Sequence, residues 1–218
     1  MHIYFLYMVA LIYRIRGHKW SPVFKRTQGH ILKVIFANNE IAILIDNGYF
    51  KQVINQILNI EHKKIDYNKL TKKIASTLKK EIYRIYFYDC PPKVKEDDKS
   101  KEMYKNFDKF LKALEHIEKF EIRLGKLVER DNEYVQKGVD VLITIDLLRI
   151  GLKIRNLDVA IITGDADFVP AIKVIKDEGI KVYLFHSEIK RQYADELYSV
   201  CDIRYPLNKE FLSDCFMR

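Results

Sequence analysis

From Ile41 onward, short runs rich in β-branched and aromatic residues alternate with longer segments whose apolar residues recur at helical spacing. The expected strands are residues 41–46, 82–88, 120–128, 159–163, 181–185 and 202–205, and the expected helices are residues 51–60, 67–80, 98–118, 139–153, 168–178 and 190–199. Such alternation is typical of βα units joined by right-handed crossovers. It predicts an α/β fold around a mostly parallel sheet.

Acidic residues follow two of these strands and begin one of the helices. Asp46 follows the first expected strand, which is almost wholly apolar. Asp165 and Asp167 follow the fourth expected strand, which is equally apolar, and Asp140 lies at the start of the fourth helix. In an open parallel sheet, ligands collect at the carboxyl ends of the strands. Three separate segments therefore deliver carboxylates, and we expect them at one edge of the sheet.

Each of these carboxylates also has a structural explanation, because aspartate caps helices and forms turns, and Asp140 is well placed as an N-cap. Taken together, however, clustered carboxylates repel one another unless a cation neutralises them. Hard divalent cations such as Mg²⁺ and Mn²⁺ prefer oxygen ligands of this kind. Asp146 lies about 240° around the helix from Asp140. We therefore expect it to form a surface ion pair with Arg149 or Lys153.

The composition is that of one compact domain. The chain has 218 residues, of which 48% are hydrophobic and 31% are charged, and this suits a sizeable core. We expect the domain at residues 41–207, after a basic, partly apolar extension at residues 1–40 and before a C-terminal tail at residues 208–218. The three widely spaced cysteines support neither a disulfide framework nor a zinc site, and they indicate a cytoplasmic protein with reduced thiols.

The apolar run Ile3–Tyr13 does not predict a membrane span, since it has 11 residues and a spanning helix needs about 20. Positive charge follows this run instead of preceding it, and no cleavage site of small residues follows, so we do not expect secretion. A surface anchor, a docking arm and a misplaced translation start all stay open for residues 1–40.

The net charge of +8 is unevenly distributed along the chain. Residues 1–40 and residues 41–80 each carry +5, whereas the rest of the chain carries −2. A basic surface beside an acidic centre suits a metal-dependent enzyme that acts on a polyanion, because lysines hold phosphates and carboxylates hold the metal. Seven lysines at residues 63–80 are expected to supply phosphate contacts; the alternative is a solvated, lysine-rich surface.

Three stretches together resemble one known family. They are Ile41-Ala-Ile-Leu-Ile-Asp-Asn47, Lys137-Gly-Val-Asp-Val-Leu-Ile-Thr-Ile-Asp-Leu-Leu148 and Ile162-Thr-Gly-Asp-Ala-Asp-Phe-Val-Pro170. This ordered set is similar to the NYN domain family, also called LabA-like or DUF88, within the PIN-like nuclease superfamily. The similarity extends from about Ile41 to Ser187, and a charged helical insert at residues 90–119 has no match in the family pattern.

The resemblance implies a three-layer α/β/α sandwich in which Asp46, Asp140, Asp165 and Asp167 bind one or two Mg²⁺ or Mn²⁺ ions as the catalytic group. It also implies that Asn47 and Lys137 lie near substrate phosphate and that Asp146 has a supporting role. The implied activity is that of a ribonuclease, which hydrolyses phosphodiester bonds with metal-activated water. RNA is favoured over DNA as the partner, and a homodimer stays open.

Other enzyme classes lack their motifs in this sequence. The chain has neither the G-x-x-x-x-G-K-[ST] loop of a nucleotide hydrolase nor the G-x-G-x-x-G turn of a dinucleotide-binding fold. An aspartyl-phosphate phosphatase ordinarily has a second aspartate two residues after the first, where this chain has Gly48. The remaining alternative to a nuclease is an RNA-binding or regulatory protein that keeps the fold and a metal without turning over substrate.

Overall fold

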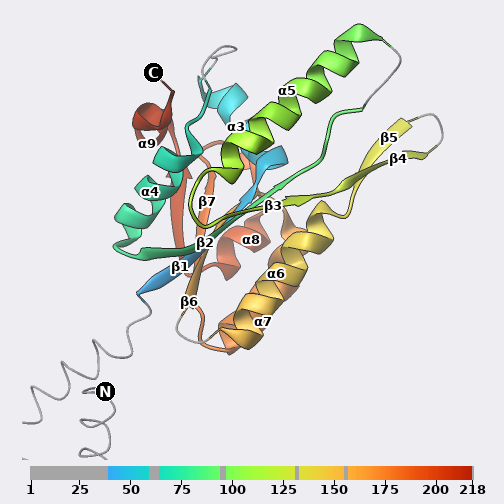
Figure 1. Cartoon of the computed structure of the whole chain (residues 1–218). Coiled ribbons are helices and arrows are strands. Elements are labelled where there is room, and N and C mark those ends of the chain that lie inside the picture. Colours follow the sequence, from blue (N-terminus) through green and yellow to red (C-terminus); the bar gives the residue numbers. More distant parts are fainter. Residues whose placement is uncertain (1–38, 59–63, 94–96, 131–132, 155–156, 218) are drawn as a thin grey trace, which may run out of the picture. The chain divides into compact units, whose positions relative to one another are not determined.

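The computed structural model describes residues 39–217, apart from 59–63, 94–96, 131–132 and 155–156. All but the last two residues of the expected extension at 1–40 therefore lie outside the described part of the chain. The described residues form an α/β fold with a six-stranded parallel sheet between two layers of helices (Figure 1). The predicted fold class is confirmed.

The strands of the sheet lie in the order β3-β2-β1-β6-β7-β8, and every neighbouring pair is parallel. Their bounds are Glu40–Asp46 for β1, Glu81–Asp89 for β2, Phe120–Leu124 for β3, Leu157–Ile162 for β6, Val182–Ser187 for β7 and Ile203–Leu207 for β8. From β1 the chain builds the sheet outward through β2 and β3, and from β6 it builds in the opposite direction. The pair β1 and β6 is therefore the topological switch point, where α/β folds place their ligand sites.

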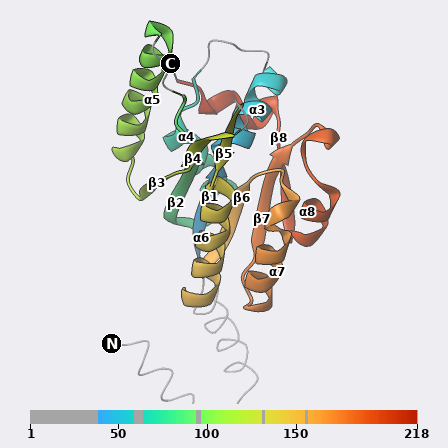
Figure 2. The same cartoon turned by 90° about the vertical axis from the view of Figure 1, so that its right-hand side faces the viewer.

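Helices cover both faces of the sheet, as two views at right angles show (Figures 1 and 2). The helices are α3 (Asn47–Leu58), α4 (Tyr67–Leu78), α5 (Asp98–Glu115), α6 (Val139–Lys153), α7 (Val169–Asp177), α8 (Asp195–Val200) and α9 (Lys209–Leu212), with short 3-10 turns η1 (Ala166–Phe168), η2 (Lys190–Gln192) and η3 (Ser213–Cys215). The apolar residues of α3, α4, α5 and α9 pack on one face, and those of α6, α7 and α8 pack on the other.

The central strands are apolar throughout because both of their faces are buried. In β1, Ile41, Ile43 and Ile45 belong to the core under α3 and α4, whereas Ala42 and Leu44 belong to the core under α6 and α7. All five side chains are fully buried. This double burial explains why strands β1 and β6 were recognisable as continuous apolar runs.

The segment 120–128, expected as one strand, forms parts of two strands. Strand β3 ends at Leu124, and β4 (Lys126–Arg130) pairs instead with β5 (Glu133–Lys137) in an antiparallel hairpin. Gly125 lies at the break, where a Cβ atom would lie 2.6 Å from Cγ2 of Val139 and 2.9 Å from the carbonyl oxygen of Lys137. Only glycine leaves room for this close approach.

Residues 208–217, expected as a tail, form α9 and η3 and add Leu212 and Cys215 to the buried core. The segment also bonds to the start of α4. The Asp66 amide donates to the Cys215 carbonyl at 2.8 Å, and the Met217 amide donates to the Lys64 carbonyl at 2.9 Å. The folded body therefore continues to the end of the described chain.

The lysine-rich segment around α4 buries Leu70 and Ile74, as expected. Lys80, however, was expected to contact phosphate, and this prediction is wrong. Its ammonium group lies 2.8 Å from the carboxylate of Asp158, and its side chain is only 10% exposed. Because the Asp158 side chain is 1% exposed, Lys80 serves as the counter-ion of a buried carboxylate.

The end of α4 also lies far from the acidic residues. The Glu81 amide, just after α4, donates to the Asn39 carbonyl at 2.8 Å, so this region lies at the amino end of β1. Asp46 is at the opposite end of that strand, about 20 Å away at the usual rise per residue. Among residues 39–217, outside the gaps given above, no helix combines the length and apolarity that crossing a bilayer requires.

Candidate metal-binding cleft

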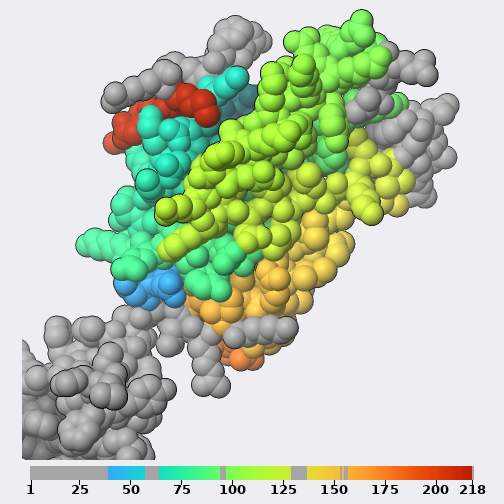
Figure 3. Space-filling view, viewed as in Figure 1, coloured from blue at the N-terminus to red at the C-terminus, as the bar shows by residue number. Residues whose placement is uncertain are grey.

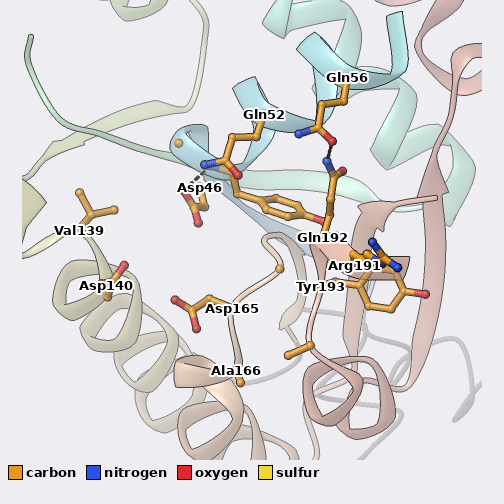
Figure 4. Close-up of a pocket in the computed structure, with 14 residues that line it drawn as sticks. Asp46, Gln52, Gln56, Val139, Asp140, Asp165, Ala166, Arg191, Gln192 and Tyr193 are labelled. Atoms are coloured by element: carbon orange, nitrogen blue, oxygen red, sulfur yellow. Dashed lines mark hydrogen bonds between the residues drawn. The ribbon is translucent and has the colours of Figure 1, made fainter. Parts of the chain in front are cut away.

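A cleft of about 710 Å³ opens at the carboxyl ends of β1 and β6. Its walls come from the start of α3, the start of α6, the segment that follows β6 and the loop at residues 191–194. In the close-up, Asp46 at the end of β1, Asp140 of α6 and Asp165 after β6 point toward one open space (Figure 4). The structure thus brings together three of the four carboxylates that we expected at one edge of the sheet.

Asp46 is the last residue of β1, and two hydrogen bonds fix its side chain. One oxygen accepts from the Tyr49 amide at 3.1 Å, and the other accepts from the Thr163 hydroxyl at 3.1 Å. Burial raises the pKa of Asp46 against the effect of these hydrogen bonds, and the charge of Asp140 raises it further. Asp46 therefore caps the first turn of α3, and its carboxylate lines the cleft in an environment that disfavours the charged form.

Asp140 is the second residue of α6 and not its N-cap, so the capping explanation is wrong for this residue. Gly138 occupies the N-cap position with φ of 90°, and no side chain caps this helix. Burial raises the pKa of Asp140, and the charges of Asp165 and Asp167 raise it further. The Asp140 carboxylate therefore lies within electrostatic range of the two aspartates that follow β6.

Asp165 and Asp167 follow β6 around the 3-10 turn η1. Asp165 is the N-cap of this turn, because its Oδ1 atom accepts from the Asp167 amide at 2.9 Å. The structural explanation thus holds for Asp165, although the residue also lines the cleft. Asp167 is exposed and does not line the cleft, but its charge acts on Asp140.

The carboxylates fit a divalent cation in their chemistry. Three oxygen donors from separate segments line one cleft, and burial, with a further contribution from neighbouring carboxylates, raises the pKa of two of them, Asp46 and Asp140. A cation would relieve this repulsion. In the described part of the chain, no three His, Cys, Asp or Glu side chains lie close enough together to hold a metal ion as they stand. Binding therefore requires the side chains to draw together.

Asn47 lies beneath the cleft floor instead of lining it. Its side chain is fully buried; its amide nitrogen donates to Asp89 at 2.7 Å, and its carbonyl oxygen accepts from the Tyr67 hydroxyl at 2.5 Å. Lys137 is exposed at the end of β5 and does not line the cleft. Neither residue therefore lines the aspartate cleft, and their expected place near substrate phosphate stays a prediction.

Asp146 pairs with Arg149 at 2.9 Å, as expected. The expected surface position is wrong, because the Asp146 side chain is only 5% exposed. Its carboxylate also accepts from the Tyr88 hydroxyl at 2.9 Å and lies 3.4 Å from the Arg123 guanidinium. Asp146 therefore links α6 to β2 and β3 and does not line the aspartate cleft.

Sequence reasoning missed the loop at residues 191–194, which forms the opposite wall of the cleft. Arg191 is exposed there, and Gln192 donates to Gln56 of α3 (Figure 4). Gly164 explains how closely this loop packs, since a Cβ atom at this position would lie 2.2 Å from the Gln192 carbonyl oxygen. The sequence predicted one helix over residues 190–199, whereas the 3-10 turn η2 ends at Gln192 and α8 begins only at Asp195. A cationic residue two positions before an aromatic one is too common a pattern to single out Arg191.

His186 lies on β7 next to this wall, and its burial predicts that the stability of the fold depends on pH. Its ring is 6% exposed and lies 4.6 Å from that of Tyr193, a residue that lines the cleft. Burial lowers the pKa of His186 from its ordinary 6.5, and Arg204 lowers it further, against a hydrogen bond between Nδ1 and the Ser187 carbonyl.

Because the unfolded chain binds this proton at higher pH than the folded chain, His186 contributes stability above pH 6.5, which is lost as the pH falls through the folded pKa. We expect the free energy of unfolding in urea to fall from pH 7.5 to pH 5.5, and to fall less in His186→Phe. The exposed His116 supplies the control, and His116→Gln should fall as the parent does. Equal losses in His186→Phe and the parent would contradict this prediction.

Two comparisons with known proteins address the family of this chain. A sequence search among curated proteins found no match. A family model described as the NYN domain matches residues 40–208, which include every strand of the parallel sheet and all four aspartates. The matched region is well over half of the chain, so the chain belongs to the NYN domain family of PIN-like nucleases.

Proposed function

We propose that the protein is a metal-dependent ribonuclease that hydrolyses phosphodiester bonds in RNA. The observation that carries the proposal is the meeting of Asp46, Asp140 and Asp165 in one cleft at the switch point of a parallel sheet. Asp167 stands beside them and adds to the negative charge. Membership in a family of PIN-like nucleases supports this reading.

These aspartates would hold Mg²⁺ or Mn²⁺, which supplies the positive charge and Lewis acidity that hydrolysis of a phosphodiester needs. The other residues of the cleft have roles of their own. Arg191 is placed to bind a phosphate on the wall opposite Asp140. Thr163 and the Tyr49 amide hold Asp46 in position, so that its orientation does not depend on the substrate.

The test is cleavage of a 5′-labelled single-stranded RNA by the purified full-length chain, with Mn²⁺ or Mg²⁺ and with EDTA. We expect products with either metal and none with EDTA. Asp177→Asn is the matched control, because this exposed residue ends α7 and does not line the cleft; it should cleave as the parent does. If the parent binds RNA without cleaving it under any of these conditions, the protein is the non-catalytic RNA-binding alternative.

A further inference from the structure

A second cleft adjoins the aspartate cleft along the first turns of α3. It has a volume of about 870 Å³ and shares Gly48 and Gln52 with its neighbour. Its other walls come from the segment that follows β2, from α5 and from β4. Helix α5 runs as a green ridge across one face of the molecule (Figure 3). The second cleft is thus built largely by the charged insert at residues 90–119.

Apolar side chains form much of the lining of the second cleft. Met103 and Phe107 reach it from α5, Pro91 and Pro92 follow β2, and Leu127 belongs to β4. Met103 is 53% exposed and Phe107 is partly exposed. An aromatic ring and a thioether that stay accessible to solvent offer flat, polarizable surfaces to a ligand with a planar ring.

The charged residues that line the second cleft are two lysines, Lys51 and Lys93, and one aspartate, Asp89. The Lys51 ammonium lies 2.8 Å from the Asp89 carboxylate and 6.0 Å from the centroid of the Phe107 ring. Asp89 is buried and also accepts from the Asn47 amide, whereas the Lys51 side chain is 51% exposed. The carboxylate is therefore neutralised within the wall, and the cation beside the ring remains accessible to a phosphate.

We propose that the second cleft binds an unpaired nucleobase of single-stranded RNA whose neighbouring phosphate lies in the aspartate cleft. This inference rests on the proposed function and adds that the RNA substrate is single-stranded. Binding of single strands combines cationic groups that follow the backbone with aromatic side chains on which bases stack, and this cleft has both beside the carboxylates. Its volume is in the range of nucleotide-sized ligands. Asn106 adds an exposed amide that can bond to the edge of a base.

The test is binding of a short fluorescent oligoadenylate, measured by anisotropy in EDTA with the full-length chain. A second oligomer of the same length lacks its bases. Replacing Phe107 with alanine should weaken binding of the oligoadenylate by on the order of tenfold, because a stacked base is lost. Binding of the abasic oligomer and of duplex RNA should change less than twofold, and so should the salt dependence, because no phosphate contact is removed. Phe107→Tyr should bind as the parent does, since it keeps the ring.

The matched control is Tyr104→Ala, which removes an exposed aromatic ring of α5 that does not line the second cleft. This variant should bind every oligomer as the parent does, and thermal melts should show that all the variants are folded. Equal losses with oligoadenylate and with the abasic oligomer, or no loss in Phe107→Ala, would overturn this inference. Neither result would contradict the proposed ribonuclease function. Failure of the parent both to bind and to cleave RNA would overturn the proposed function itself.

Discussion

Replacing Asp165 with asparagine should lower the rate of Mn²⁺-dependent RNA cleavage by about 100-fold or more. The side chain lines the aspartate cleft, and removal of one carboxylate from a metal site is expected to cost several kcal/mol of transition-state stabilisation, at about 1.36 kcal/mol for each factor of ten. Asp46→Asn and Asp140→Asn should lose activity to a similar degree. The rate is measured with labelled RNA at saturating Mn²⁺, with Asp177→Asn as the control for the loss of a charge.

Thermal melts with and without Mn²⁺ separate this role from helix capping. Asparagine retains the Oδ1 atom that accepts from the Asp167 amide and caps about as well as aspartate, so Asp165→Asn removes the charge and keeps the cap. Without metal, the variant should melt at the same temperature as the parent or higher, because the Asp165 charge raises the pKa of Asp140. With Mn²⁺ the parent should gain stability and the variant should not. An equal gain from Mn²⁺ in both proteins would exclude Asp165 from the metal site.

Replacing Lys80 with alanine should lower the free energy of unfolding by about 3 kcal/mol or more. Asp158 is 1% exposed and lies 2.8 Å from the Lys80 ammonium, so this variant removes a charged partner from a buried carboxylate. Asp158 also accepts hydrogen bonds from the Lys181 amide at 3.2 Å and from the Tyr183 hydroxyl at 3.4 Å. Because both are weaker than the ion pair, they do not replace it.

Urea denaturation measures this loss, which corresponds to a fall in melting temperature of roughly 6–12 °C for a domain of this size. Lys72→Ala is the control, since this exposed lysine lies on α4 and should change the stability by less than about 0.5 kcal/mol. The double variant with Lys80→Met and Asp158→Asn should recover part of the loss, because it removes both charges of this buried pair. A Lys80→Ala protein as stable as the parent would show that the ion pair does not contribute to the fold.

The sequence by itself predicted the two central strands, because both of their faces are buried. The residues of β1 and β6 read as unbroken apolar runs for that reason, and the acids directly after them could be placed at the carboxyl end of the sheet. The alternation of strands and helices then sufficed for a parallel α/β fold. The motifs around Asp46, Asp140 and Asp165 indicated the family for the same reason, since they lie at those strand and helix ends.

Tertiary packing decided what depends on neighbours distant in the sequence. The strand β3 ends at Leu124 because Gly125 packs against the start of α6, which no pattern within residues 120–128 reveals. Lys80 looks like any other lysine of its segment until Asp158 is placed beside it, 78 positions along the chain.

In the aspartate cleft, too, some features follow from the sequence and others from tertiary packing. Asp46 and Asp165 lie together because β1 and β6 are neighbours, and the sequence sets the order of strands along the chain but not across the sheet. Asn47 directly follows Asp46, yet α3 begins there and directs its side chain into the core, where Asp89 and Tyr67 bind it. Arg191 lines the cleft in a segment that packs closely against Gly164, which lies 27 positions earlier in the chain. Side-chain periodicity depends on local burial and could be read from the sequence, whereas contacts between distant segments depend on how the layers pack, and only the folded chain determines them.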